Sequence, residues 1–146
     1  MKIFSLFLIL ISSFAFTQTL EENLIKSTVN GLFDGMKTSD SAKINKAFSK
    51  TAVLQTITKN GEVKTENIND FALGISKAEK GSLDERITFS SIFIDGNLAS
   101  VWTPYEFYYQ GKFSHCGVNS FQLVKSNNEW KIQYIIDTRR KDNCKK

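Results

Sequence analysis

Three alternating stretches in the second half of the chain decide the fold: LASVWTPYEFYY (98–109), KFSHCGVNSFQLVK (112–125) and WKIQYIIDTR (130–139). Each is rich in aromatic and β-branched residues, which favour strands. The dipeptides between them, Gln110-Gly111 and Asn127-Asn128, are typical of tight hairpin turns. These stretches therefore predict three long antiparallel strands that follow one another as a meander.

The first half of the chain predicts three helices. Thr19-Leu-Glu-Glu22 has the form of a capping box, the signature of a helix start. Apolar residues then recur at helical spacing as far as Met36. Ser39 or Asp40 is expected to start a second, short helix, and Asn67 is expected to cap a third.

Shorter strands are predicted between and after these helices. Residues 52–58 and 62–65 flank Lys59-Asn-Gly61, a combination typical of a hairpin. Residues 86–94 predict one further strand, which leads into the meander. Helices first and antiparallel strands afterwards indicate an α+β fold in one domain.

The N-terminal residues have the three parts of a secretory signal peptide. Lys2 gives a positive start, residues 3–16 are almost entirely apolar, and Ala15 and Thr17 place small residues before a cut at Gln18. We therefore expect a signal peptide in residues 1–17 and a single mature domain in residues 18–146. The alternative is a membrane anchor, but the apolar run is shorter than the roughly 20 residues that span a bilayer. The predicted location is secreted or periplasmic, with no membrane contact after cleavage.

The charge balance does not point to a nucleic-acid partner. Lys and Arg number 19 against 15 Asp and Glu, and much of the excess is in the C-terminal tail. A basic run at a chain end is usually a solvated end, and the sequence has no basic stripe elsewhere. We expect no nucleic-acid binding.

The two cysteines, Cys116 and Cys144, are expected to form a disulfide. Pairing is the usual state of two cysteines in an oxidising compartment, and the bridge would stabilise the fold by roughly 3–4 kcal/mol. A metal site would need more ligands than these cysteines and His115, which is the only histidine. No metal or other cofactor is expected.

Counting outward from the two turns predicts the register of the meander. Glu106 then faces His115, Trp102 faces Asn119, and Phe121 faces Tyr134. These residues share the apolar side of the sheet, where polar groups need partners or a pocket. The opposite side would carry Asp137 and Arg139 as a structural ion pair. It would also carry an apolar stripe, a possible homodimer surface: Tyr105, Phe107, Val118 and Ile135. A slip of one residue would exchange the sides.

Several short motifs resemble a known group of proteins. They are Asp84-Glu-Arg-Ile87, Ile94-Asp-Gly-Asn-Leu-Ala99, Val101-Trp-Thr-Pro-Tyr105, Gly111-Lys-Phe-Ser-His-Cys-Gly117, Phe121-Gln-Leu-Val124, Trp130-Lys-Ile132 and Asp137-Thr-Arg-Arg140. The mature chain resembles the nuclear transport factor 2-like superfamily, and within it small secreted bacterial proteins labelled "putative lumazine-binding" or polyketide-cyclase-like (SnoaL-like). The resemblance implies a cone-shaped fold with three N-terminal helices packed on a curved antiparallel sheet. It also makes a homodimer through the outer sheet face a reasonable expectation.

The resemblance leaves the function open, since this superfamily includes isomerases, dehydratases, epoxide hydrolases and binding domains. We favour a non-catalytic domain that binds a small hydrophobic or aromatic ligand in an apolar, aromatic-lined pocket. Its predicted lining is Trp102, Tyr108, Asn119, Phe121 and Tyr134. One alternative is a cofactor-free isomerase, dehydratase or cyclase, similar to ketosteroid isomerase, with Glu106 and His115 as acid and base. Against catalysis, residues 49–58 contain no acid or histidine, where enzymes of the superfamily often carry their base. The other alternative is a purely structural or interaction domain.

Overall fold

The computed structural model describes the backbone of residues 3–144 and the side chains of residues 19–144. The predicted signal peptide of residues 1–17 and the cut before Gln18 lie outside the residues with described side chains, and both stay predictions. Within the described part, no helix is long and apolar enough to cross a membrane.

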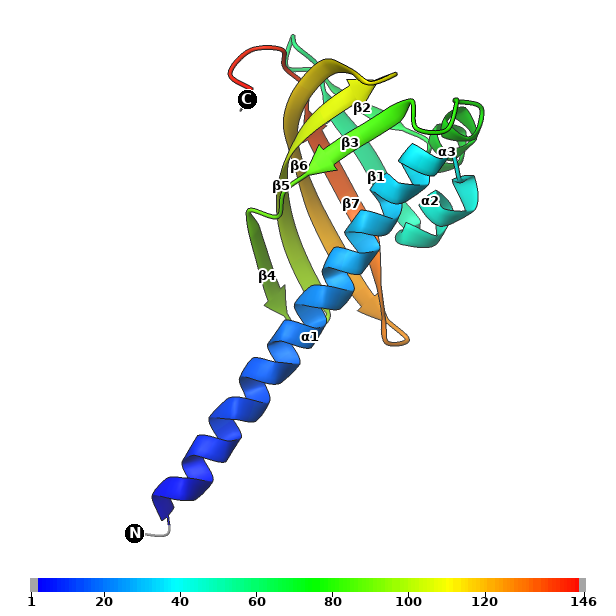
Figure 1. Cartoon of the computed structure of the whole chain (residues 1–146). Coiled ribbons are helices and arrows are strands. Elements are labelled where there is room, and N and C mark those ends of the chain that lie inside the picture. The colour runs from blue at the N-terminus through cyan, green and yellow to red at the C-terminus, as the bar shows by residue number, and fades with distance from the viewer. Residues whose placement is uncertain (1–2, 145–146) are drawn as a thin grey trace.

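Residues 3–144 form three helices and seven strands (Figure 1). In chain order they are α1 (Ile3–Thr38), α2 (Ser41–Ala47), β1 (Phe48–Ile57), β2 (Val63–Glu66), α3 (Ile68–Ser76), β3 (Leu83–Ile87), β4 (Ser91–Asp95), β5 (Leu98–Tyr109), β6 (Lys112–Ser126) and β7 (Glu129–Thr138).

The described strands form one sheet in the order β2–β1–β7–β6–β5–β3, and β4 pairs with β5 on the same side as β3. All neighbouring strands are antiparallel except β1 and β7, which are parallel. The predicted α+β class is therefore confirmed, but the predicted antiparallel sheet is mixed. The parallel pair arises because β1 and β7 are far apart in the sequence and are not joined by a hairpin. In addition, α3 follows β1 and β2, so the three helices do not all precede the strands.

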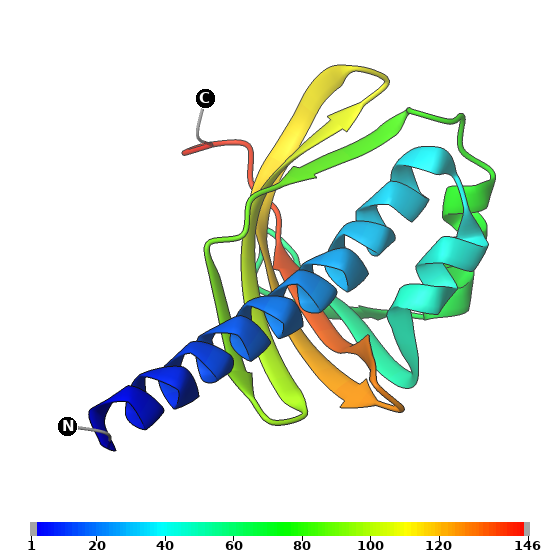
Figure 2. The ribbon, with the colours of Figure 1, turned by 60° about the horizontal axis from the view of Figure 1, so that its bottom comes forward.

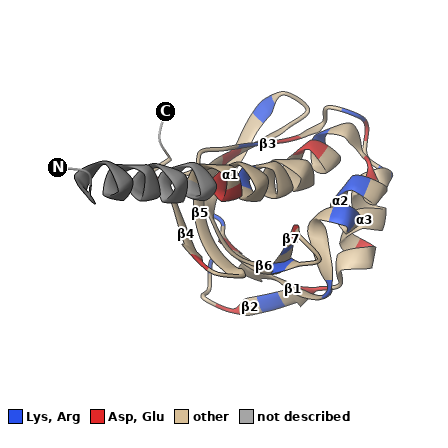
Figure 3. Ribbon diagram, turned by 90° about the horizontal axis from the view of Figure 1, so that it is seen from below, with Lys and Arg blue, Asp and Glu red and all other residues tan. Residues whose placement is uncertain are grey.

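Helix α1 lies across the concave face of the curved sheet (Figure 2; Figure 3). Its residues Ile25 and Val29 have no exposed surface, and neither do Phe121 and Ile132 of the sheet. The rings of Phe33 and Phe121 meet edge to face, with centroids 6.2 Å apart. The helical spacing of apolar residues in the sequence thus corresponds to the buried face of α1.

Polar contacts tie the same helix to the hairpin between β6 and β7. The carboxylate of Glu21 accepts hydrogen bonds from Lys125 Nζ at 2.7 Å and from Trp130 Nε1 at 2.8 Å. Thr28 Oγ1 donates to the carbonyl of Trp130 at 3.2 Å. These contacts fix the position of α1 along the sheet.

The predicted helix boundaries are partly confirmed. Asp40 and Asn67 cap α2 and α3, and each side chain accepts hydrogen bonds from amides of the first helical turn. The prediction of a helix start at Thr19 is wrong, because α1 already begins at Ile3. The residues before Thr19 include no glycine or proline, so nothing in the sequence interrupts the helix there.

The single strand predicted for residues 86–94 is two strands. β3 pairs with the second half of β5, and β4 pairs with its first half. The connection between them stays attached to β5, since Thr88 N donates to the carbonyl of Pro104 and Ser90 N to that of Trp102, each at 3.0 Å. The bend at residues 88–90 lets one edge of the sheet change direction.

The predicted register is correct next to each turn and wrong beyond it. Tyr108 pairs with Phe113 as predicted, but the next pair is Phe107 with His115, so β6 contains one extra residue at this point. This bulge exchanges the two faces of β5 relative to β6. The predicted pairing of Glu106 with His115 is therefore wrong, and Glu106 pairs with Cys116 instead.

A second bulge has the same effect in β7. Lys125 pairs with Trp130 as predicted, whereas Gln122 pairs with Tyr134. One extra residue in β7 turns Tyr134 away from the face of Phe121, which pairs with Ile135. As a result the C-terminal half of β7 directs Ile135 and the next alternate residues into the concave face.

Cys116 and Cys144 form the predicted disulfide. Cys116 follows His115, which lies on the concave face, and neighbouring residues of a strand point to opposite sides. The bridge is therefore on the outer side of the sheet. The backbone of Cys116 also exchanges two hydrogen bonds with Arg140, each 2.9 Å long, so the segment after β7 is attached to β6 by both kinds of link.

Replacing both cysteines by serine is expected to lower the free energy of unfolding by roughly 3–4 kcal/mol, because the unfolded chain loses a closed loop. The two cysteines are 28 positions apart. Urea denaturation of the wild type and the double variant measures the difference. A reductant should destabilise the wild type and leave the variant unchanged, and equal midpoints without reductant would contradict the prediction.

Candidate functional site

A pocket of about 180 Å³ opens between the concave face of the sheet, α1 and α3. Most of its wall is apolar and aromatic: Leu32, Phe33, Met36, Phe48, Leu54, Phe71, Ile75, Leu83, Phe107 and Ile135. The remaining lining residues are polar: Gln55, Thr56, Glu66, Glu85, Tyr105, His115, Asn119, Asp137 and Arg139. An apolar wall with a small group of polar side chains is the usual composition of a small-molecule site.

The polar side chains come together because the strands align them in rows across the sheet. Thr56, Asp137, Asn119 and Thr103 are successive cross-strand partners on β1, β7, β6 and β5. A second row joins β6, β5 and β3 through His115, Phe107 and Glu85. Cross-strand partners share one face of the sheet, so both rows face the pocket side.

Asp137 accepts hydrogen bonds from two side chains, and a third polar group lies close to it. Thr56 Oγ1 donates a short hydrogen bond to Oδ1, and Arg139 Nε donates to Oδ2 at 3.0 Å. The hydroxyl of Tyr105 lies 3.4 Å from the same Oδ2. The predicted ion pair between Asp137 and Arg139 is confirmed, but it lies at the pocket and not on the outer face.

Glu85 is the most perturbed acid in the pocket. Its Oε1 accepts a hydrogen bond of 2.8 Å from Asn119 Nδ2, a contact that reaches from β3 to β6 because the sheet is curved. Protein atoms enclose the carboxyl group, although the residue keeps some surface accessible. Burial and the charge of Asp137 raise the pKa of Glu85 to about 7, against the opposing effects of Asn119 and Arg139. Near neutral pH the carboxyl is therefore divided between its two protonation states.

The side chain of Tyr105 packs over a glycine of the neighbouring strand, Gly117. Its hydroxyl donates to the carbonyl of Thr138 at 2.9 Å. A Cβ atom at Gly117 would lie 1.8 Å from this carbonyl oxygen and 2.8 Å from the Tyr105 hydroxyl. Burial and the nearby carboxylates raise the pKa of Tyr105, so the phenol stays protonated and acts as a donor.

His115 lies in an aromatic environment. Its ring meets Tyr105 edge to face with centroids 5.7 Å apart, and the Phe107 ring is 5.0 Å away. Burial lowers the pKa of His115, as do the charges of Arg139 and Lys141, while Asp137 acts in the opposite direction. The imidazole is therefore neutral at pH 7. Its Nδ1 is 3.1 Å from Ser114 Oγ.

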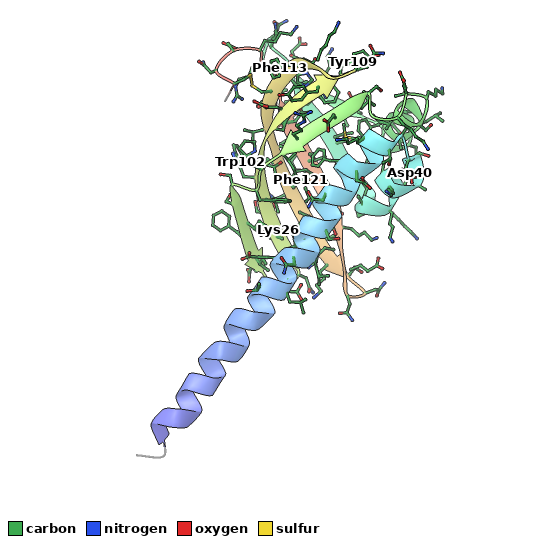
Figure 4. The ribbon with its side chains drawn as sticks, in the orientation of Figure 1. Lys26, Asp40, Trp102, Tyr109, Phe113 and Phe121 are labelled. Atoms are coloured by element: carbon green, nitrogen blue, oxygen red, sulfur yellow. A yellow bond between two sulfur atoms is a disulfide. The ribbon has the colours of Figure 1, made fainter. Side chains whose placement is uncertain are left out.

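The structure places only part of the predicted site in this pocket. His115 and Asn119 line it as predicted. Phe121 is on the correct face but is packed in the core without exposed surface. Figure 4 shows Phe121 between α1 and the sheet, and Trp102 on the outer side.

The remaining predicted residues are outside the pocket because of the two bulges. Trp102 is 47% exposed, and the hydroxyl of Tyr108 donates to Glu106 at 3.0 Å. Tyr134 donates from its hydroxyl to Gln55 at 2.8 Å. The proposed acid–base pair of Glu106 with His115 is therefore wrong.

Conversely, three residues assigned to the outer stripe, Tyr105, Phe107 and Ile135, line the pocket. Sequence reasoning missed Glu85 altogether as a site residue. A signal for it was present, because Leu83 and Ile87 flank it at alternate positions, the pattern of a strand face that points into a core. No group of three or more His, Cys, Asp or Glu side chains in residues 19–144 could hold a metal ion.

A family model described as "putative lumazine-binding" matches residues 20–134. The chain belongs to this family. It is also similar to solved nuclear transport factor 2-like proteins of unknown function. One is from Shewanella baltica, with 19% identity, a TM-score of 0.68, and coverage of 84% of this chain and 95% of that one. Another is from Silicibacter pomeroyi, with 15% identity, a TM-score of 0.69, and coverage of 84% and 98%.

A domain of unknown function with a cystatin-like fold, from Nostoc punctiforme, is similar as well. It has 17% identity and a TM-score of 0.68, with coverage of 84% of this chain and 78% of that one. No curated protein matches this chain. At these identities the likeness to solved structures shows the fold alone, and it confirms the nuclear transport factor 2-like resemblance seen in the sequence.

Changing Gly117 to Ala is expected to destabilise this family member by about 2 kcal/mol or more, because the new methyl group would overlap the Thr138 carbonyl and the Tyr105 ring. Thermal and urea unfolding measure the loss. Gly74→Ala is the matched control, since a Cβ there meets nothing within 4 Å and alanine favours a helix. Similar stability of the two variants would argue against the Tyr105 contact.

Changing Glu85 to Gln is expected to alter how stability depends on pH. Folding raises the pKa of Glu85 to about 7, so the folded protein holds a proton that the unfolded chain releases at lower pH. The stability that protonated Glu85 contributes to the folded protein is present at low pH and is lost as the pH rises through about 7.

The free energy of unfolding of Glu85→Gln minus that of wild type should therefore increase by roughly 1–3 kcal/mol when the pH is raised from 5 to 8. Urea denaturation at both pH values measures the gain. Glu106→Gln removes a carboxyl group from the outer face and serves as the control. A difference between Glu85→Gln and wild type that does not change with pH would contradict the raised pKa.

Proposed function

We propose that this chain is an exported, non-catalytic domain that binds a small, largely apolar ligand in the pocket between α1, α3 and the sheet. The main support is the pocket itself, an apolar and aromatic wall that ends at the enclosed carboxyl group of Glu85. Burying a carboxyl group costs free energy unless its environment compensates. A protein that needed only a stable core would be better served by an apolar side chain here.

The pocket volume limits the size of the ligand. A cavity of about 150 Å³ lined by apolar side chains is large enough for benzene, so about 180 Å³ suits a molecule of one or two rings. Lumazine, which the family description names, is a compound of two fused rings. The family match supports a ligand of this size.

Export is supported by the composition of the N-terminal residues and by the disulfide, which is typical of proteins outside the cytoplasm. We expect neither nucleic acid nor a membrane as a partner. A homodimer through the outer sheet face stays a prediction. The exposed apolar residues of that face include Phe93, Leu98, Trp102 and Phe113. Of the stripe first assigned to it, Val118 stays on that face, since it pairs with Pro104.

A second candidate function, proton transfer in the same pocket, is favoured by one observation. Glu85 has a pKa of about 7, which suits a general acid or base near neutral pH. The test is to incubate the ligand with the protein in deuterated water and look for deuterium at carbon. Incorporation that disappears in Glu85→Gln would favour catalysis over binding alone.

The binding function predicts that protein purified from its own host retains a small molecule, detectable by native mass spectrometry. Phe107→Ala is expected to weaken binding of that molecule about tenfold or more, because it removes an aromatic wall of the pocket. Trp102→Ala, a change of similar size on the outer face, should leave binding unchanged. Thermal-shift titration with the retained molecule measures both, and an equal loss in the two variants would count against this pocket.

A further inference from the structure

The hydrogen bonds at the polar end of the pocket leave one acceptor open. Asn119 Nδ2 donates to Glu85 Oε1, Thr56 donates to Asp137, and Tyr105 donates to the carbonyl of Thr138. Among the described residues, no side chain or backbone group donates to the second oxygen of Glu85. This atom is also not one of the fully buried, unpartnered polar atoms of residues 19–144. It is therefore an acceptor that a ligand in the pocket can reach.

The charges around this oxygen are mainly negative. Glu85 and Asp137 face each other across the curved sheet, and the exposed side chain of Glu66 adds a third carboxyl group to the lining. Arg139 is the positive group of the lining, and its Nε is bonded to Asp137. The protein as a whole carries a formal net charge of +4, so the acidic character is local to the pocket.

Aromatic side chains line the pocket next to Glu85. Phe107 is the direct cross-strand partner of Glu85, and the rings of Tyr105 and Phe107 both contact His115. The faces of phenyl and phenol rings attract cations. A carboxylate next to such rings offers a cation both a charged partner and a weakly polar wall.

We propose that the ligand of this pocket is a flat ring that carries a protonated nitrogen, and that Glu85 binds this nitrogen. The proposal rests on the ligand-binding function proposed above and adds the chemical class of the ligand. The ring lies against the aromatic wall around Phe107. The N–H group donates to the free oxygen of Glu85 and pairs with its charge.

Binding of such a cation requires the ionised form of Glu85. With a pKa of about 7, the ionised fraction rises about tenfold between pH 6 and pH 8, and the affinity for a permanently charged cation should rise with it. The other groups around Glu85 are Asp137 from β7, Arg139 just after the end of β7, Asn119 and His115 from β6, Tyr105 from β5, and Glu66 from β2. The lowered pKa of His115 keeps its ring neutral over most of this range, and Tyr105 stays protonated.

The test compares three probes of the same shape and different charge: benzamidine, benzamide and benzoate. Isothermal titration of the purified protein at pH 6, 7 and 8 is expected to show benzamidine binding tightest, with an affinity that rises about tenfold over the range. Benzoate should bind at least tenfold more weakly. Glu85→Gln should remove both the preference for benzamidine and its pH dependence, whereas Glu106→Gln on the outer face should change neither.

The outcomes separate this proposal from the function on which it rests. If benzamide or benzoate binds as tightly as benzamidine, the preference for a cation is overturned and small-ligand binding stands. The same holds if benzamidine binds equally at all three pH values, a comparison that needs no variant. If none of the probes binds and no small molecule is retained from the host, both proposals are overturned.

Discussion

The hydrogen bond from the Tyr105 hydroxyl to the Thr138 carbonyl links β5 to the end of β7 across β6. It requires Gly117 on β6, because any side chain there would occupy the space of the ring and of the carbonyl. The contact holds the end of β7 next to Tyr105 of β5 and Gly117 of β6 on the concave side. Asp137 precedes Thr138 and is thereby placed near the Tyr105 hydroxyl. The polar end of the pocket depends on this contact, since it brings together side chains that are distant in the sequence.

The sequence is enough to predict the strands of the meander, both short-helix caps and the disulfide, because each has a local signature. It is not enough to predict which side chains face the pocket. The alternation of side chains along a strand predicts which of them share a face only while the pairing register is continuous. One extra residue in β6 and one in β7 each exchange the two faces of the strand beyond the bulge. Glu106 and Tyr134 were consequently placed inside, and Tyr105 and Asp137 outside. A bulge depends on the fit between strands and on sheet curvature, which no short segment encodes.

Glu85 is harder to account for by folding alone. Its carboxyl group has one hydrogen bond from Asn119, while burial and the nearby Asp137 both disfavour its charge. Leu83 and Ile87, its alternate neighbours on β3, are both partly buried apolar residues packed against the core. An apolar side chain at position 85 would continue that pattern without the cost of desolvating a carboxyl group. The presence of an acid at this position therefore supports the ligand binding proposed above and does not follow from the stability of the sheet.

The disulfide and the pocket share one short segment of β6. Cys116 lies between His115, which lines the pocket, and Gly117, over which the Tyr105 ring packs. The bridge to Cys144 and the backbone pairing with Arg140 hold the chain that follows β7 against this segment. Arg139 is the residue immediately before that pairing, and its contact with Asp137 offsets part of the negative charge around Glu85. The disulfide and the backbone pairing thus hold in place the segment that carries Arg139 to the polar end of the pocket.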